Sequence, residues 1–209
     1  MGKKTVLATI GPALAGVAIS AATWSQIPDP MPIHWGASGE PNGWAPRVVG
    51  LLMLPLIGLI ASAITGWAMR RGKLTEGMTA GVVLGMGGFH LGMHALAVQA
   101  ALHPTFSLSL ASVIVMMGAL FGGLGLVMPQ LEQNRWAGVR TPWSLADEVN
   151  WKLTHRFAAW SMGISGVACM VAAVVLPVPF SFWVGMTAVL LGSLSPVGYS
   201  YVIHRMRRS

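Results

Sequence analysis

His90 and His94 stand four residues apart within an otherwise apolar stretch of the sequence. On a helix this spacing places both imidazoles on one face, where they could bind the same divalent metal, such as zinc. His34, in an earlier polar segment, is assigned as a third ligand, and Asp29 or Glu40 of that segment as the base for hydrolysis. The alternative is structural, because an imidazole inside a helix bundle can hydrogen-bond a carbonyl or hydroxyl group.

The motifs of common hydrolases are missing from the sequence, which contains neither HExxH nor GxSxG. We therefore predict that the protein is not an enzyme and expect no cofactor. A metal-binding protein or metallohydrolase built on His34, His90 and His94 is the alternative. A transporter is less favoured, because the apolar segments contain no Asp, Glu, Lys or Arg and the chain has no repeated halves.

The composition indicates that lipid, rather than water, surrounds most of the chain. Of the 209 residues, 54% are apolar and only 9% are charged, whereas an ordinary soluble domain has about 25% charged residues. The runs between charged clusters exceed the roughly 18 residues that mark a candidate membrane helix. We predict an all-α, polytopic membrane protein that forms a single domain over residues 1–209. Its six transmembrane helices are predicted at residues 5–24, 48–69, 77–102, 108–128, 157–176 and 180–204.

The positive charges predict the orientation of these helices. With the N-terminus inside, all but one of the 13 Lys and Arg residues fall in inner segments, and Arg47 alone lies outside. Inner loops of membrane proteins carry an excess of Lys and Arg, so both termini are predicted to be cytoplasmic. Because these cations lie between apolar spans, the net charge of +7 does not indicate nucleic-acid binding.

Residues 25–47 form the predicted outer loop, which includes the stretch IPDPMPIHWGASGEPNGWAPR. Its prolines favour an extended backbone, and its glycines favour a turn. The tryptophans could anchor the loop at the membrane interface, and the polar residues could be solvated turn residues. The alternative is that the loop recognises a peptide together with the helix ends. The residues assigned to recognition are Asp29, His34, Trp35, Glu40, Asn42 and Trp44.

Residues 129–156 form the longest predicted inner segment and include EQNRWAGVRTPWSLADEVNWKLTHRF. Gly138 can supply a turn, and Pro142 would end a preceding helix. Ser144 followed by Asp147 is typical of a helix start. We therefore predict a short interfacial helix from Leu145 into the fifth span.

The aromatic and charged residues of this inner segment allow two interpretations. Trp143 and Trp151 are predicted to lie in the inner headgroup layer, with Arg140 paired to Asp147 or Glu148. The segment is then either a membrane-anchoring elbow or a docking surface for a cytoplasmic partner.

A glycine stripe marks the third predicted span. Gly81, Gly85, Gly88 and Gly92 fall on one helical face, and small residues at this spacing let a neighbouring helix approach closely. The predicted partner is the fourth span, which carries Gly118 and Gly122.

Both polar segments resemble those of the SdpI family of bacterial membrane proteins. The stretch PDPMPIHWGASGEPNGWAPR is similar to the DUF1648-like module found near the N-terminus of such proteins. In the inner segment, the residues that are similar to the family signature are Asn134, Gly138, Arg140, Thr141, Pro142, Trp143, Ser144, Leu145, Glu148, Trp151 and Arg156.

This resemblance implies a multi-pass protein of the bacterial cytoplasmic (inner) membrane that protects the cell against a secreted antimicrobial peptide toxin. Some proteins of this type also hold a small transcriptional repressor at the membrane. The expected partners are therefore a peptide toxin, a cytoplasmic repressor and the lipid bilayer, and the expected activity is binding and signalling rather than catalysis.

Overall fold

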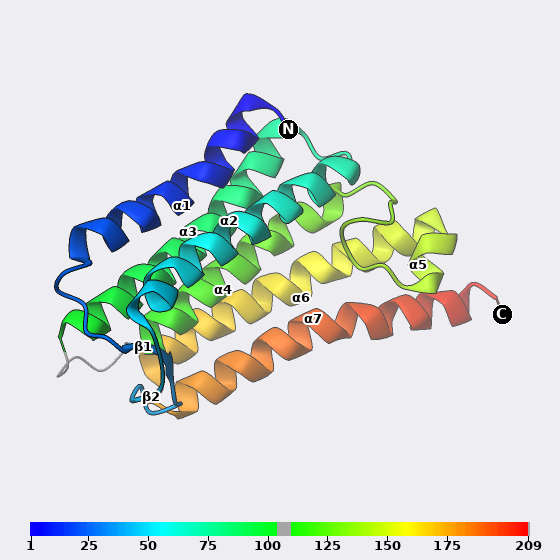
Figure 1. The fold of residues 1–209 in the computed structure, drawn as a ribbon. Coiled ribbons are helices and arrows are strands. Elements are labelled where there is room, and N and C mark those ends of the chain that lie inside the picture. Colours follow the sequence, from blue (N-terminus) through cyan, green and yellow to red (C-terminus); the bar gives the residue numbers. More distant parts are fainter. Residues whose placement is uncertain (104–109, 209) are drawn as a thin grey trace.

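The computed structural model describes residues 1–103 and 110–208 and shows an elongated bundle of long helices (Figure 1). Six of these helices are long and apolar enough to cross a membrane, as predicted. They are α1 (Lys3–Thr23), α2 (Arg47–Arg71), α3 (Glu76–Leu102), α4 (Leu110–Val127), α6 (Glu148–Val175) and α7 (Phe180–Met206). The shorter elements are strands β1 (Met31–Trp35) and β2 (Pro41–Ala45), the 3-10 helix η1 (Met128–Gln130) and helix α5 (Pro142–Ala146). The predicted start of the fourth span at Leu108 lies outside the described residues.

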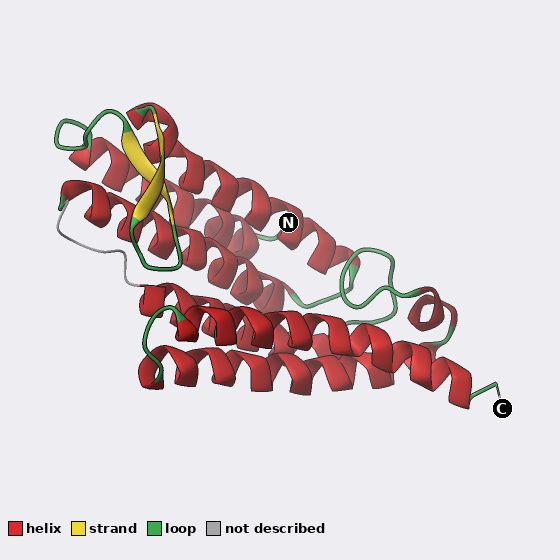
Figure 2. Ribbon diagram, turned by 90° about the horizontal axis from the view of Figure 1, so that it is seen from below, coloured by secondary structure: helices red, strands yellow, loops and turns green. Residues whose placement is uncertain are grey.

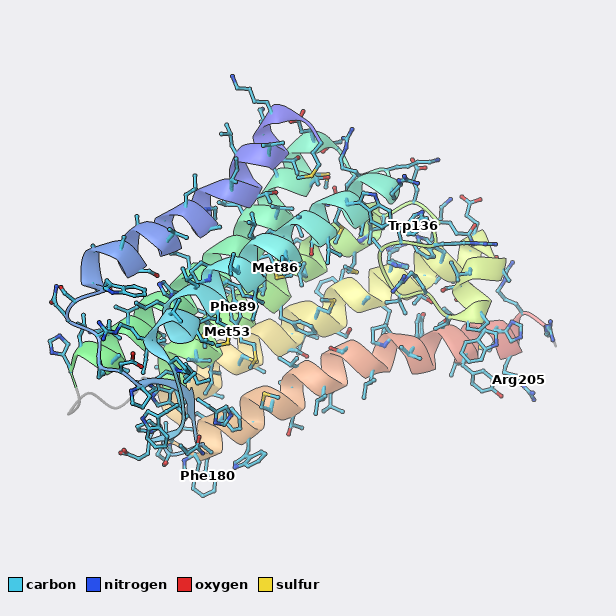
Figure 3. The ribbon with its side chains drawn as sticks, viewed as in Figure 1. Met53, Met86, Phe89, Trp136, Phe180 and Arg205 are labelled. Atoms are coloured by element: carbon cyan, nitrogen blue, oxygen red, sulfur yellow. The ribbon has the colours of Figure 1, made fainter. Side chains whose placement is uncertain are left out.

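The two ends of the bundle carry different structures. Strands β1 and β2 lie at one end, here called the hairpin end, whereas both termini, α5 and the segment before it lie at the other, the loop end (Figure 1). Trp136 and Arg205 mark the loop end, and Phe180 marks the opposite end (Figure 3). All Lys and Arg residues except Arg47 belong to segments at the loop end, so the predicted separation of charge is present in the fold.

The long helices form two groups of three. In the N-terminal bundle, α3 packs along both α1 and α2, which also contact each other. In the C-terminal bundle, α6 packs along α4 and α7. Helices α3 and α4 contact each other far less extensively (Figure 2). An apolar crevice of about 250 Å³, lined in part by Gly81, Gly85 and Gly123, follows this seam between the bundles.

The predicted packing of the α3 glycine stripe against α4 is confirmed only in part, because the glycines of α4 do not meet those of α3. Gly118 of α4 instead meets α6, where a Cβ added at Gly118 would lie 2.6 Å from the carbonyl oxygen of Gly166. No atom lies within 4 Å of a Cβ built at Gly81 or Gly88. On the stripe, side chains of α4 approach Gly92, where a Cβ would lie 2.5 Å from Met116 Sδ, and Gly85, where it would lie 3.8 Å from Leu120 Cδ1. Off the stripe, Pro12 of α1 packs at 2.8 Å from a Cβ built at Gly87. Small residues permit a close approach but do not choose the partner helix.

Prolines inside two long helices are compensated by serines of neighbouring helices. Proline cannot donate a backbone hydrogen bond, so each leaves the carbonyl four residues earlier without its helical partner. Ser20 Oγ of α1 donates to Leu51 O, four residues before Pro55, at 2.7 Å. Likewise, Ser161 Oγ of α6 donates to Gly192 O, four residues before Pro196, at 3.1 Å. Such compensation matters in lipid, where water cannot satisfy the freed carbonyl.

The fifth span begins earlier than predicted, and its short preceding helix is separate. Helix α5 begins after Thr141, whose side chain accepts a hydrogen bond from Ser144 N, and it stops at Asp147. The Asp147 carboxylate then accepts from Val149 N at 2.9 Å and caps α6, which starts at Glu148 rather than at residue 157. Hydropathy marked only the apolar part of α6, because a helix can extend beyond the hydrocarbon core into its charged first turns.

Candidate recognition surfaces at the two ends of the bundle

The predicted outer loop folds into a β-hairpin. Strands β1 and β2 are antiparallel, with Met31 opposite Ala45 and Trp35 opposite Pro41. At the tip, Gly36 N donates to Glu40 O at 2.9 Å, and Gly39 has a φ of +85°, which glycine adopts readily. The extended backbone and the glycine turn agree with the sequence analysis, and the strand pairing adds a small sheet to an otherwise helical fold.

The base of the hairpin is fastened to the helix ends. Asp29 Oδ1 accepts from Arg47 N at 3.1 Å, so this carboxylate lies at the positive N-terminus of α2. The Arg47 guanidinium donates to Trp24 O at 2.9 Å and lies 5.7 Å from the centre of the Trp24 ring. The fully buried Met31 packs against Gly50, where a Cβ would lie 2.7 Å from its sulfur. Asp29 therefore has a structural role in this arrangement.

The six residues assigned to recognition in this loop do not share one environment. Trp35 is half-buried and packs against Ala100 of α3 and Leu110 of α4. By contrast, Trp44 is 55% exposed. Asp29, His34, Glu40 and Asn42 are also exposed, and His34 Nδ1 is hydrogen-bonded to Asn42 Oδ1 across the hairpin. We define the hairpin face as His34, Glu40, Asn42 and Trp44.

At the loop end, residues 131–141 are organised by their own side chains. The Asn134 carboxamide oxygen accepts from Trp136 N at 2.7 Å and from Ala137 N at 2.8 Å. Gly138 has a φ of +101°, and a side chain there would overlap His155 Nε2. That nitrogen accepts from Val139 N at 3.0 Å. Gly138 thus provides the predicted turn, and His155, which the sequence analysis overlooked, holds it.

A buried polar network connects this loop to α6 and α7. Thr141 Oγ1 and Ser200 Oγ are 2.6 Å apart. Ser200 Oγ also donates to Asn150 Oδ1 at 2.9 Å, and Asn150 Nδ2 donates back to Ser200 O at 2.9 Å. Thr154 and Ser144 complete the network, with Ser144 Oγ donating to Val139 O at 2.7 Å. A satisfied buried network of this kind specifies one conformation of the loop.

Two predictions for aromatic and charged residues at this end are wrong. Trp151 is 1% exposed rather than interfacial, and its indole donates to Leu131 O at 2.7 Å. Arg140 pairs with neither Asp147 nor Glu148, and instead donates to Arg135 O at 3.1 Å. The sequence places Trp151 beside charged residues, but helical periodicity turns its side chain toward the bundle.

The two acidic residues predicted to pair with Arg140 have other partners. Asp147 pairs with Arg207, which directly follows α7, at 2.8 Å, and Glu148 pairs with Lys152 at 2.7 Å. Desolvation acts to raise the pKa of Asp147, but the Val149 N–H and the Arg207 guanidinium outweigh it and lower that pKa below its usual value. Trp143 is half-buried, with its ring centre 5.0 Å from that of Tyr201.

A second set of contacts joins the loop to the N-terminal bundle. Lys73 and Glu132 form an ion pair at 2.7 Å, and the hydrogen bond and charge of Glu132 raise the pKa of Lys73. The Arg71 guanidinium lies over both Trp67, at 5.2 Å, and Trp136, at 5.6 Å. These five residues, here called the inter-bundle clamp, bridge the seam at the loop end. The clamp was not predicted from the sequence, because its two parts, residues 67–73 and residues 132–136, lie more than 50 positions apart in the chain.

Comparison with known proteins places both ends of the bundle in one family. The SdpI/YfhL protein family matches residues 130–200, and the domain of unknown function DUF1648 matches residues 13–59. The chain is also 27% identical over 148 residues to "Immunity protein SdpI" of Bacillus subtilis (strain 168), which covers 68% of this chain and 69% of that relative. This chain belongs to the SdpI family. No solved structure matches it.

The two SdpI-family matches fall on different bundles. The DUF1648 match includes the hairpin and parts of α1 and α2, whereas the SdpI/YfhL match includes the loop, α5, α6 and most of α7. Trp67, Arg71 and Lys73 of the clamp lie outside both matched ranges, and Glu132 and Trp136 lie inside the second. Membership of a family with an immunity protein also supports the prediction that the chain is not an enzyme.

The structure does not bring the three histidines of the metal alternative together. His94 is fully buried, with Nε2 3.0 Å from Ser20 Oγ, and His90 Nδ1 is 2.8 Å from Met86 O. His34 lies on the hairpin face. Over residues 1–103 and 110–208, no group of three or more His, Cys, Asp or Glu side chains is arranged to hold a metal ion. The contacts of His90 and His94 instead match the structural alternative.

Proposed function

We propose that this SdpI-family protein is an immunity protein of the bacterial cytoplasmic membrane, which protects the cell by binding a secreted antimicrobial peptide at its hairpin end. The similarity to "Immunity protein SdpI" carries this proposal, together with the six membrane-spanning helices. The hairpin face supports it, because exposed aromatic and polar side chains on a firmly attached strand pair are suited to peptide recognition.

The proposed orientation has the loop end in the cytoplasm. Its support is the concentration of Lys and Arg in the loop-end segments, with Arg47 alone at the hairpin end. Arg47 is also engaged internally by Asp29 and Trp24. A secreted peptide would therefore meet the hairpin face first. Modification of an engineered cysteine at Ser38 by a membrane-impermeant thiol reagent in intact cells would support this orientation, and modification only after cell lysis would contradict it.

The second part of the proposal concerns a cytoplasmic repressor. The inside of the loop is occupied by hydrogen bonds, but Arg135 and Arg140 are exposed, and Trp136 is 45% exposed. These three residues form a basic and aromatic surface that suits protein docking. The clamp joins this surface, through Trp136, to the bundle that carries the hairpin, which would let toxin binding alter the docking surface.

Protection is tested by expressing the chain in a Bacillus subtilis strain that lacks its Immunity protein SdpI. Cells are challenged with culture supernatant from toxin-producing cells, and survival is compared with that of an empty-vector strain. Survival restored by the wild-type chain and reduced by Trp44→Ala at equal membrane abundance supports recognition at the hairpin face. Equal survival of the Trp44→Ala and wild-type strains would contradict a role for this residue.

The repressor proposal needs a separate readout. A fluorescently tagged repressor is scored for membrane or cytoplasmic location, with and without toxin. Arg140→Ala is expected to preserve protection and to impair retention of the repressor at the membrane. Loss of protection and retention together would contradict separate roles for the two ends.

A further inference from the structure

A groove on the outer face of α6 at the loop end takes no part in the polar network or the clamp. Its volume is about 580 Å³. The lining residues are Pro129, Val149, Lys152, Leu153, Arg156, Ala159 and Trp160. Its wall is therefore mainly apolar, with two cationic side chains, at the point where the charged first turns of α6 give way to its apolar part.

The groove residues are ordered along the helix axis. Lys152, Arg156 and Trp160 follow one another at intervals of four residues, so they share one face of α6, at levels roughly 6 Å apart. Lys152 is nearest the loop end, and Trp160, which is 74% exposed, is nearest the apolar part of the helix. This order matches the layers of a bilayer surface, with charge outside and aromatic side chains at the interface.

Arg156 is available to a ligand. It is exposed, and within residues 1–103 and 110–208 it has neither an ion pair nor a hydrogen bond from its side chain to the protein. Lys152 pairs with Glu148, but both side chains are about two-thirds exposed (69% and 66%). An exposed pair of this kind contributes little stability, so Lys152 can exchange Glu148 for a stronger anion.

We propose that this groove binds the headgroup of an anionic glycerophospholipid, such as phosphatidylglycerol. The Arg156 guanidinium would bind the phosphate diester through paired N–H donors. Trp160 and Ala159 lie on the membrane side of Arg156, where the glycerol ester groups and the start of an acyl chain would pack. This assignment gives Arg156 a role that the loop network does not, and it depends on the membrane-spanning fold rather than on toxin binding.

Lys152 provides the selectivity of the proposed site. It lies one turn beyond Arg156 on the side away from the membrane, where the headgroup substituent of a phosphate-bound lipid would extend. A choline or ethanolamine ammonium group there would be repelled by the Lys152 ammonium, whereas a glycerol group would accept its hydrogen bonds. The groove should therefore prefer phosphatidylglycerol to phosphatidylcholine.

Native mass spectrometry of the full-length protein in detergent tests the proposal. The probes are phosphatidylglycerol and phosphatidylcholine with identical acyl chains. Wild-type protein is expected to retain phosphatidylglycerol more tightly, and Arg156→Gln to weaken that binding by about tenfold. Lys152→Gln is expected to reduce the preference between the two lipids. The matched control is Arg205→Gln, an exposed cation at the same end of the bundle (Figure 3), which should change binding by less than about twofold.

Several outcomes would overturn the site. Equal retention of both lipids by the wild type would contradict the proposed selectivity. A loss of phosphatidylglycerol affinity in Arg205→Gln as large as that in Arg156→Gln would show a general effect of positive charge rather than a site. If Arg156→Gln fails to fold, as judged by circular dichroism, Arg156→Lys keeps the charge but loses the paired donors. An intermediate phosphatidylglycerol affinity for Arg156→Lys supports the proposal, and wild-type affinity contradicts it.

Discussion

The hairpin end and the loop end both carry dense sequence motifs, but they use these residues in opposite ways. At the hairpin end, the structural contacts are concentrated around Asp29, Arg47 and Met31, and the hairpin face leaves His34 and Trp44 exposed. At the loop end, the conformation is held from inside by hydrogen bonds among side chains of the loop, α6 and α7.

This contrast shows that most residues of a family signature can serve to hold the protein's own structure rather than to contact a partner. Of the signature residues, Asn134, Gly138, Thr141 and Trp151 hold the loop itself. The exposed members, above all Arg140 and Arg156, are the ones left for external partners. Substitutions at internally bonded positions, compared with substitutions at exposed positions, therefore test directly whether the two ends differ in this way.

The largest effect is expected for Gly138→Ala. A side chain at this position meets His155 Nε2, and the positive φ strains any residue other than glycine. We expect the free energy of unfolding to fall by about 2–4 kcal/mol, measured by thermal unfolding in detergent. Gly163→Ala is the control, because no atom lies within 4 Å of a Cβ there. Similar stability of the two variants would contradict the proposed role of the turn.

The second prediction compares one asparagine at each end. Asn150→Ala leaves Thr154 Oγ1 and Ser200 O without their Asn150 partner inside the protein, so unfolding should become easier by about 2–3 kcal/mol. Asn42→Ala, on the exposed hairpin face, should change the free energy of unfolding by less than about 0.5 kcal/mol but should reduce protection against toxin. The comparison fails if Asn42→Ala destabilises the protein as much as Asn150→Ala.

The third prediction separates the two tryptophans of the hairpin. Trp35 packs against α3 and α4, so Trp35→Ala should lower the free energy of unfolding by about 1–3 kcal/mol. Trp44 is mostly exposed, and Trp44→Ala should leave the melting temperature nearly unchanged while weakening protection. Melting curves and toxin survival are measured on the same preparations. A stable Trp35→Ala variant with full protection would show that this side chain does not hold the hairpin.

The smallest effect is expected at the clamp. The Lys73 and Glu132 side chains are 70% and 61% exposed, so a double-mutant cycle with Lys73→Ala and Glu132→Ala should give a coupling energy of about 0.2–1 kcal/mol. The pair formed by Glu148 and Lys152, similarly exposed within one helix, provides the reference cycle. A coupling above about 2 kcal/mol would mean that the N-terminal bundle, rather than the internal network, holds the loop.

Several features of the protein could be predicted from local sequence alone. The six spans follow from apolar runs, because crossing a bilayer demands length and hydrophobicity whatever the neighbours are. The extended stretch and turn of the hairpin follow from proline and glycine, which restrict or free their own backbone angles. The turn at Gly138 follows for the same reason.

Partners distant in the chain were decided only by the tertiary structure. Gly118 had equally suitable glycines on α3 and α6, and packing selected Gly166. Arg140 had two acidic residues nearby in the sequence, but Asp147 pairs with Arg207 and Glu148 pairs with Lys152. The spacing of His90 and His94 was compatible with a metal, yet His90 contacts the carbonyl oxygen of Met86 on its own helix and His94 contacts the hydroxyl of Ser20 on α1. Local sequence determines the preferred backbone conformation of a segment and whether it lies in lipid or in water. The choice among chemically equivalent partners depends on which helices meet, and that is a property of the whole fold.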